Sequence, residues 1–277
     1  MATGALLLAS AVWGWTFVLV KDALREVGPF WFLALRFTLA TLLALPFLRG
    51  RREARLARNW RWGAILGLAL FGGYFLQTWG LVYTTAQKSG LITGLSVVLV
   101  PVVAWAFGRR PSVRAWVGVA LSGGGVSLLA LGGDSLGGGA WFGDLLTAFC
   151  AIAFAVHLVL LDRYAKAGDP RALLAPQVGL VALLSLAGSG WQREVSFAFS
   201  SHVWVAVGVT AALATTGAFA LVLWAGRRAS AARMAIVLAT EPVFAALFGW
   251  WLLGEVLFLV QMAGGALVMA GILSQRS

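Results

Sequence analysis

Ten stretches of about 20 apolar residues follow one another along the chain, separated by short polar connections. They cover roughly residues 4–20, 30–48, 62–83, 89–107, 114–132, 141–161, 172–190, 203–223, 233–253 and 257–274. A run of this length spans the hydrocarbon core of a bilayer as a helix. The pattern therefore predicts an all-α membrane protein with ten transmembrane helices. Its loops are too short to hold a soluble domain, so we expect its function to lie within the bilayer.

Composition and charge support this interpretation. Of the residues, 61% are hydrophobic and only 11% are charged, whereas soluble domains carry about 25% charged residues. The net charge of +11 does not indicate a nucleic-acid partner, because the basic residues alternate between connections. With the N-terminus inside, sixteen lie in inner segments, four in outer segments, and Arg36 within a span. This positive-inside bias predicts that both termini are cytoplasmic.

Landmark residues recur about halfway along the chain. Pro29 and Pro170 are 141 residues apart, as are Pro101 and Pro242, and VPVVAWAFG resembles EPVFAALFG. The chain is therefore interpreted as a duplicated five-helix unit. The two units are expected to cover residues 1–133 and 140–277. Because five is odd, the second unit must enter the membrane from the opposite side. Inverted repeats are typical of secondary transporters, which bind solute near the midplane between the halves.

Glycines mark the last helix of each half. The fifth and tenth spans share a seven-residue spacing, which places Gly118 and Gly125 in one span and Gly264 and Gly271 in the other. Small residues allow membrane helices to approach closely. We expect these two spans to pack together, with oligomerisation as the weaker alternative.

Glu241 and Pro242 interrupt one of the most apolar runs. Proline frees backbone groups one turn back, and such groups are tolerated in a bilayer only against protein or a water-filled cavity. One interpretation is a kink in which Thr240 or Glu241 caps the next half-helix. The other is that Glu241 faces the cavity, where it contacts a substrate amine or carries a proton. Pro101 repeats the helix break without the acid, since Val100 stands in the equivalent place.

Two further ionisable residues lie within spans. Arg36 could extend outward to the interface, pair with an acid, or bind a substrate carboxylate. The acids considered are Asp22, Glu26, Glu241 and Glu255. His157 is either a buried histidine bonded to a neighbouring helix or a proton- or substrate-binding group. Both sets of alternatives remain open from the sequence.

Milder polar residues complete the candidate cavity. Most such residues in membrane helices form interhelical hydrogen bonds, but the spans that carry them are expected to surround the cavity. Trp13 is the candidate aromatic wall, because it lies mid-span and not at an interface like most of the tryptophans. The other candidates are Tyr74, Gln77, Ser96 and Thr215.

Five segments carry a resemblance to a known family. They are WGWTFVLVK (13–21), RFTLATLLALP (36–46), GLVYTTAQKSGLIT (80–93), RRPSVRAWVGVALSGGGV (109–126) and TEPVFAALFGWWLLGE (240–255). Together they resemble the EamA family of the drug/metabolite transporter superfamily over essentially the whole chain. The resemblance implies a multi-pass carrier of the bacterial inner membrane, often an exporter of amino acids or other small metabolites.

The expected function is thus secondary transport by alternating access, with a small solute, and possible proton coupling, as its partners. A carrier of other solutes such as cationic drugs is the alternative, and a membrane-embedded enzyme or scaffold is a remote one. The sequence has two histidines, one cysteine and no GxxxxGK[ST] loop. We therefore expect no metal, no cofactor and no catalytic residues. The oligomeric state is expected to be a monomer or weak oligomer.

Overall fold

The computed structural model describes residues 2–48, 53–108, 110, 112–131, 140–167, 173–226, 237–238, 240–256 and 258–274. Regular structure in these ranges is helical, with no strand. Its elements are α1 (Ala2–Ala23), α2 (Pro29–Ala44), η1 (Leu45–Leu48), α3 (Glu53–Tyr83), α4 (Ala86–Thr93), α5 (Leu95–Ala106), α6 (Val113–Leu131), α7 (Ala140–Ala167), α8 (Leu174–Gln192), α9 (Ser201–Val209), η3 (Thr210–Gly217), α10 (Ala218–Gly226), α12 (Glu241–Leu253) and α13 (Leu259–Ser274). Helical residues thus occur in each of the ten predicted spans.

Six helical segments are long and apolar enough to cross a membrane. They are Ala2–Ala23, Trp60–Tyr83, Ala86–Ala106, Ala140–Leu161, Leu174–Gln192 and Ser201–Val222. Pro29–Ala44, Glu241–Leu253 and Met262–Gly271 are shorter apolar helices. The all-α membrane fold predicted from the apolar pattern is confirmed.

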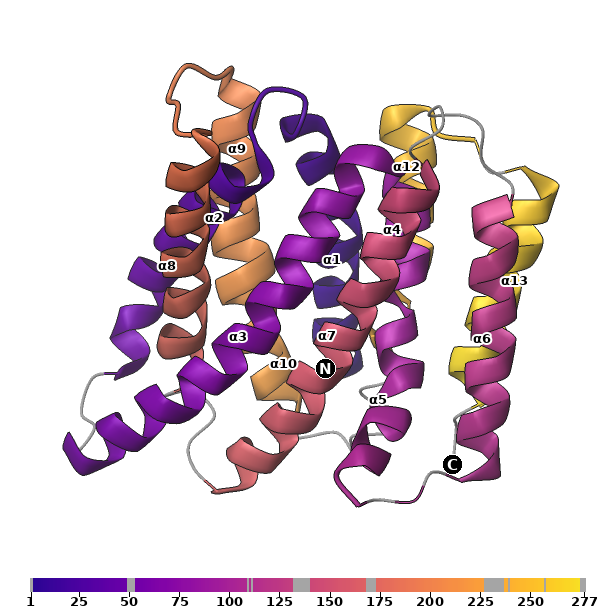
Figure 1. Ribbon diagram of the computed structural model, residues 1–277, viewed down its shortest axis with the longest axis horizontal. Coiled ribbons are helices and arrows are strands. Elements are labelled where there is room, and N and C mark those ends of the chain that lie inside the picture. Colours follow the sequence, from indigo (N-terminus) through magenta and orange to yellow (C-terminus); the bar gives the residue numbers. More distant parts are fainter. Residues whose placement is uncertain are drawn as a thin grey trace.

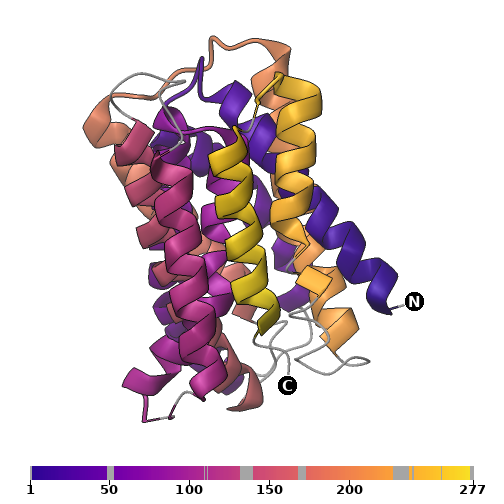
Figure 2. The ribbon, with the colours of Figure 1, turned by 90° about the vertical axis from the view of Figure 1, so that its right-hand side faces the viewer.

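The helices run mostly along one direction and form a bundle (Figure 1). Helices from the two halves of the sequence pack directly on one another: α2 on α8, α3 on α7 and α8, and α1 on α10 and α12. Helices α6 and α13 pack on each other at one side of the bundle (Figure 1). The start of α1 and the end of α13 both point to the lower end in Figure 2. The loops after α1, α3, α8 and α12 lie at the other end (Figure 1).

The α6–α13 contact follows the predicted glycine spacing. A methyl group built at Gly125 would lie 2.5 Å from the carbonyl oxygen of Gly264, and one at Gly271 would lie 2.6 Å from that of Gly118. The two helices are therefore in backbone contact at two levels, seven residues apart. The expectation that these spans form a packing pair is confirmed.

The helix interruptions differ from those expected. Pro101 lies inside α5 and does not end it, and the fourth span instead divides at Gly94, between α4 and α5. Proline within a span is tolerated where neighbouring groups accommodate the freed carbonyl. In the ninth span, α12 begins at Glu241 with Pro242 in its first turn. The hydroxyl of Thr240 donates to the carbonyl of Val237 and makes no cap, so the capping role expected of Thr240 is wrong.

Candidate functional site

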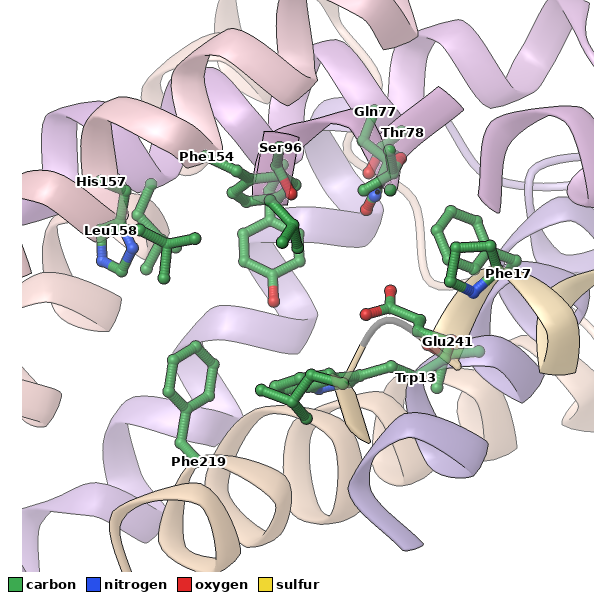
Figure 3. Close-up of a pocket in the computed structure, with 18 of the residues that line it drawn as sticks. Trp13, Phe17, Gln77, Thr78, Ser96, Phe154, His157, Leu158, Phe219 and Glu241 are labelled. Carbon is green, nitrogen blue, oxygen red and sulfur yellow. Dashed lines mark hydrogen bonds between the residues drawn. The ribbon is translucent and has the colours of Figure 1, made fainter. Parts of the chain in front are cut away.

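A cavity of about 230 Å³ lies in the middle of the bundle, lined by residues of both halves (Figure 3). Six of the seven residues expected to face a cavity line it, together with Arg36 and Pro242. The six are Trp13, Tyr74, Gln77, Ser96, His157 and Glu241. Thr215 and Pro101 are not among its lining residues. Their roles in binding or movement remain predictions.

Glu241 occupies the first position of α12, where its carboxylate points into the cavity (Figure 3). Within the described ranges, it forms no ion pair and no hydrogen bond to another residue. Helix α12 begins here and not at the membrane surface, so the acid stands at the N-terminal end of a half-length helix. A negative charge is favoured there by the helix dipole, and the group remains free to bind a solute.

Trp13 forms one wall of the cavity. Its indole Nε1 donates to the carbonyl of Ala214 at 2.7 Å, and its ring meets Phe219 edge-on at 6.0 Å. Phe154 and Tyr74 meet edge-on at 5.2 Å on another part of the wall. These aromatic rings leave a mostly apolar cavity with a few polar groups, which is the usual character of small-molecule sites.

Arg36 is only 3% exposed, so it does not extend outward to the interface as one interpretation held. Its Nε donates to Thr215 Oγ1 at 3.2 Å, and its guanidinium lies 4.6 Å from the centre of the Tyr74 ring and 5.1 Å from that of Phe37. No acid pairs with it in the part of the chain that the structure describes. The positive charge is therefore held by a hydroxyl and two aromatic faces, and it borders the cavity.

Thr215 contributes through Arg36 and not as part of the cavity wall. It belongs to the π-helix η3, in which its hydroxyl donates to the carbonyl of Thr210 five residues earlier. The wider turns of a π-helix displace side chains and carbonyls from their α-helical directions. The same element provides the Ala214 carbonyl that accepts from Trp13. Nothing in the sequence pattern indicated this π-helix.

His157 is buried, and its Nε2 lies 2.8 Å from Oε1 of Gln177 on α8. The interhelical hydrogen bond considered from the sequence is therefore present, while the histidine also borders the cavity. Gln77 donates to Thr93 Oγ1 at 3.2 Å at the break between α4 and α5. Both contacts place polar side chains at the cavity wall in fixed positions.

The cavity lining contains seven pairs of residues that are 141 positions apart in the sequence. They are Trp13 and Phe154, Thr16 and His157, Phe17 and Leu158, Val20 and Leu161, Thr78 and Phe219, Leu81 and Val222, and Val97 and Leu238. The charged groups are not repeated, because Gln177 corresponds to Arg36 and Val100 to Glu241. Equivalent positions of the two halves thus form the cavity wall, and its charges are unique. The repeat offset applied to Trp13 could have identified Phe154 from the sequence.

The EamA-like transporter family matches the chain twice, at residues 2–131 and 141–274. The chain belongs to the EamA-like transporter family. An uncharacterized transporter of Archaeoglobus fulgidus is 33% identical over 97% of this EamA chain and 83% of its own length. The uncharacterized inner membrane transporter YedA of Escherichia coli is 26% identical over 98% of the chain and 89% of its own length. A solved crystal structure shares the fold, with a TM-score of 0.68 and 22% identity over 99% of this chain and 95% of the other.

The resemblance found in the sequence is thus confirmed, and the protein is a multi-pass membrane transporter of the EamA type. No group of three or more His, Cys, Asp or Glu side chains that could hold a metal ion occurs among the described residues. A transporter of this family is not an enzyme, and its chemistry is the binding and release of a solute.

Proposed function

We propose that this EamA transporter is a secondary carrier that moves a small zwitterionic metabolite, such as an amino acid, by alternating access around the central cavity. Export across a bacterial inner membrane is the proposed direction. The single observation that carries the proposal is the cavity itself, which presents the carboxylate of Glu241 and the guanidinium side of Arg36 within aromatic walls. An acid and a base in one small cavity match the amine and carboxylate of a zwitterion.

The proposed architecture is two inverted five-helix repeats, residues 1–133 and 140–277, with both termini cytoplasmic. The helix contacts support it. Exchanging the two halves converts the contact of α1 with α10 into that of α3 with α7, and the contact of α1 with α12 into that of α7 with α4 and α5. The seven equivalent pairs around the cavity agree with the same exchange. Two similar halves of opposite orientation offer two states of similar energy, one open to each side.

Cavity size distinguishes between the solute classes. Pockets for drug-sized molecules measure about 300–1,000 Å³, whereas this cavity measures about 230 Å³. The size favours an amino acid or similar metabolite over a large drug cation. A small organic cation is the second candidate, because aromatic rings and an unpaired carboxylate suit it as well.

Glu241 is proposed to bind the substrate amine, or a proton in its place. A counterflow screen in proteoliposomes against amino acids, other metabolites and organic cations, at two pH values, tests the proposal. We expect accumulation of at least one zwitterion and its loss in Glu241→Gln, while Asp22→Asn, an exposed acid outside the cavity, transports normally. Accumulation of cations alone would favour the second candidate. No solute movement at all would favour a scaffold.

A further inference from the structure

Polar contacts between the two halves gather at the end of the bundle opposite the termini, the upper end in Figure 1. There Glu194 accepts a hydrogen bond from the backbone N–H of Trp31, and Glu26 accepts from the backbone N–H and the hydroxyl of Ser200. The largest group of these contacts surrounds the first turn of α4. We call this group, made of Glu255, Gln87, Lys88, Asp144 and Thr84, the α4 clasp.

Glu255 joins the α12–α13 connection to α4. Its two carboxylate oxygens accept from the backbone N–H groups of Ala86 and Gln87 at 2.8 and 2.9 Å. The Gln87 side chain donates in return to the backbone carbonyl of Glu255 at 2.9 Å. A carboxylate from the second half thus caps a helix of the first half, where the free N–H groups and the helix dipole both favour it.

Lys88 and Asp144 join α4 to α7 one turn further on. The ammonium of Lys88 lies 2.9 Å from Asp144 Oδ2, and both side chains are buried, at 3% and 4% exposure. Thr84 Oγ1 donates to the other oxygen of the same carboxylate. Breaking a buried pair of this kind leaves an uncompensated charge, so the two halves can separate here only if water enters.

Exposure of equivalent cavity residues differs between the two ends. Phe17, toward the clasp, is 5% exposed, whereas its equivalent Leu158, at the opposite end of the cavity, is 40% exposed (Figure 3). Val20 is buried and its equivalent Leu161 is half-buried, and the same holds for Leu81 and Val222. The cavity is therefore sealed toward the clasp and more accessible toward the end that holds the termini.

We propose that the α4 clasp is a gate, and that the structure is the state in which solute reaches the cavity from the face of the termini. Opening toward the other face requires Glu255 to leave α4 and Lys88 to separate from Asp144. This inference rests on the proposed alternating access. It predicts that the clasp residues set the balance between the two states without contacting the solute.

Two single-cysteine reporters test the gate in a Cys150→Ala background, which removes the sole native cysteine. Val20→Cys reports on the clasp side of the cavity, and its equivalent Leu161→Cys reports on the other side. A membrane-impermeant thiol reagent is applied to each face of oriented vesicles without solute. Before any clasp change, we expect Leu161→Cys to react from the face of the termini and Val20→Cys to react poorly from either face.

Adding Glu255→Gln removes the charge that caps α4, and the loss of a helix cap shifts an equilibrium by about five- to tenfold. We expect labelling of Val20→Cys from the far face to rise by about that factor, and labelling of Leu161→Cys from the near face to fall. The control Asp22→Asn removes an exposed acid at the same end that pairs only with Arg25, three residues away, and should change neither rate.

Opposite changes at the two reporters support the gate, because general loosening would raise both rates. Unchanged rates, or a rise at both positions, would overturn it. The outcome is separate from the counterflow screen: a working gate without transport would contradict the proposed function, and transport with unchanged labelling would contradict the gate.

Discussion

Gly125 provides a sharp test of the packing between α6 and α13. A methyl group added there would lie 2.5 Å from the carbonyl oxygen of Gly264 and 2.8 Å from the backbone nitrogen of Val268, against an ordinary contact of 3.4–4 Å. Both neighbours are backbone atoms of a helix, which cannot rotate away, so the helices must separate by most of an ångström. Overpacking of this kind costs about 1–3 kcal/mol. Gly125→Ala is therefore expected to destabilise the protein by that amount.

Gly124→Ala is the matched control, one position away in the same helix. A methyl group at Gly124 meets nothing within 4 Å, and alanine is favoured over glycine within a helix by up to about 1 kcal/mol. Reversible unfolding in detergent, followed by tryptophan fluorescence, should separate the two variants by about 2–4 kcal/mol. If Gly125→Ala unfolds at the same denaturant concentration as Gly124→Ala, the close approach of these helices is refuted.

Two further predictions follow from the polar contacts. Asp144→Asn should lower the free energy of unfolding by about 3–5 kcal/mol, because it leaves the buried ammonium of Lys88 unpaired, whereas Asp22→Asn at an exposed pair should cost less than about 1 kcal/mol in the same denaturation assay; equal losses would contradict the burial of the first pair. The two hydrogen bonds from Ser200 lower the pKa of Glu26 below its ordinary value of 4.5, so its stabilising contribution is present above that pH and is lost as the pH falls through the lowered value; a melting temperature that falls equally in Glu26→Gln over this range would contradict it.

The sequence was sufficient for the features that depend on long apolar runs and on recurring landmarks. A helix must satisfy its own backbone groups in a bilayer, so the ten apolar runs could be assigned without knowledge of neighbours. Pro29 begins α2, and Pro242 lies in the first turn of α12. The glycine spacing correctly paired α6 with α13, because close approach requires small residues at matching heights.

Features that depend on which side chains meet could not be predicted in this way. The sequence offered Arg36 four acids, yet it bonds to Thr215 and stacks on Tyr74, because the π-helix turns the threonine toward it. Lys88 and Asp144 are 56 residues apart and pair only once α4 packs on α7. Neither contact has a local sequence signal, since each depends on the relative rotation of two helices.

The central claim is that two halves of opposite orientation enclose the cavity, and labelling of equivalent positions outside it tests this claim most directly. Arg25 follows α1, and Lys166, 141 residues later, lies in the last turn of α7. Single cysteines at these positions, in the Cys150→Ala background, should react with an impermeant thiol reagent from opposite faces of the membrane. Reaction of both from the same face would contradict the inverted arrangement and, with it, the proposed alternating access.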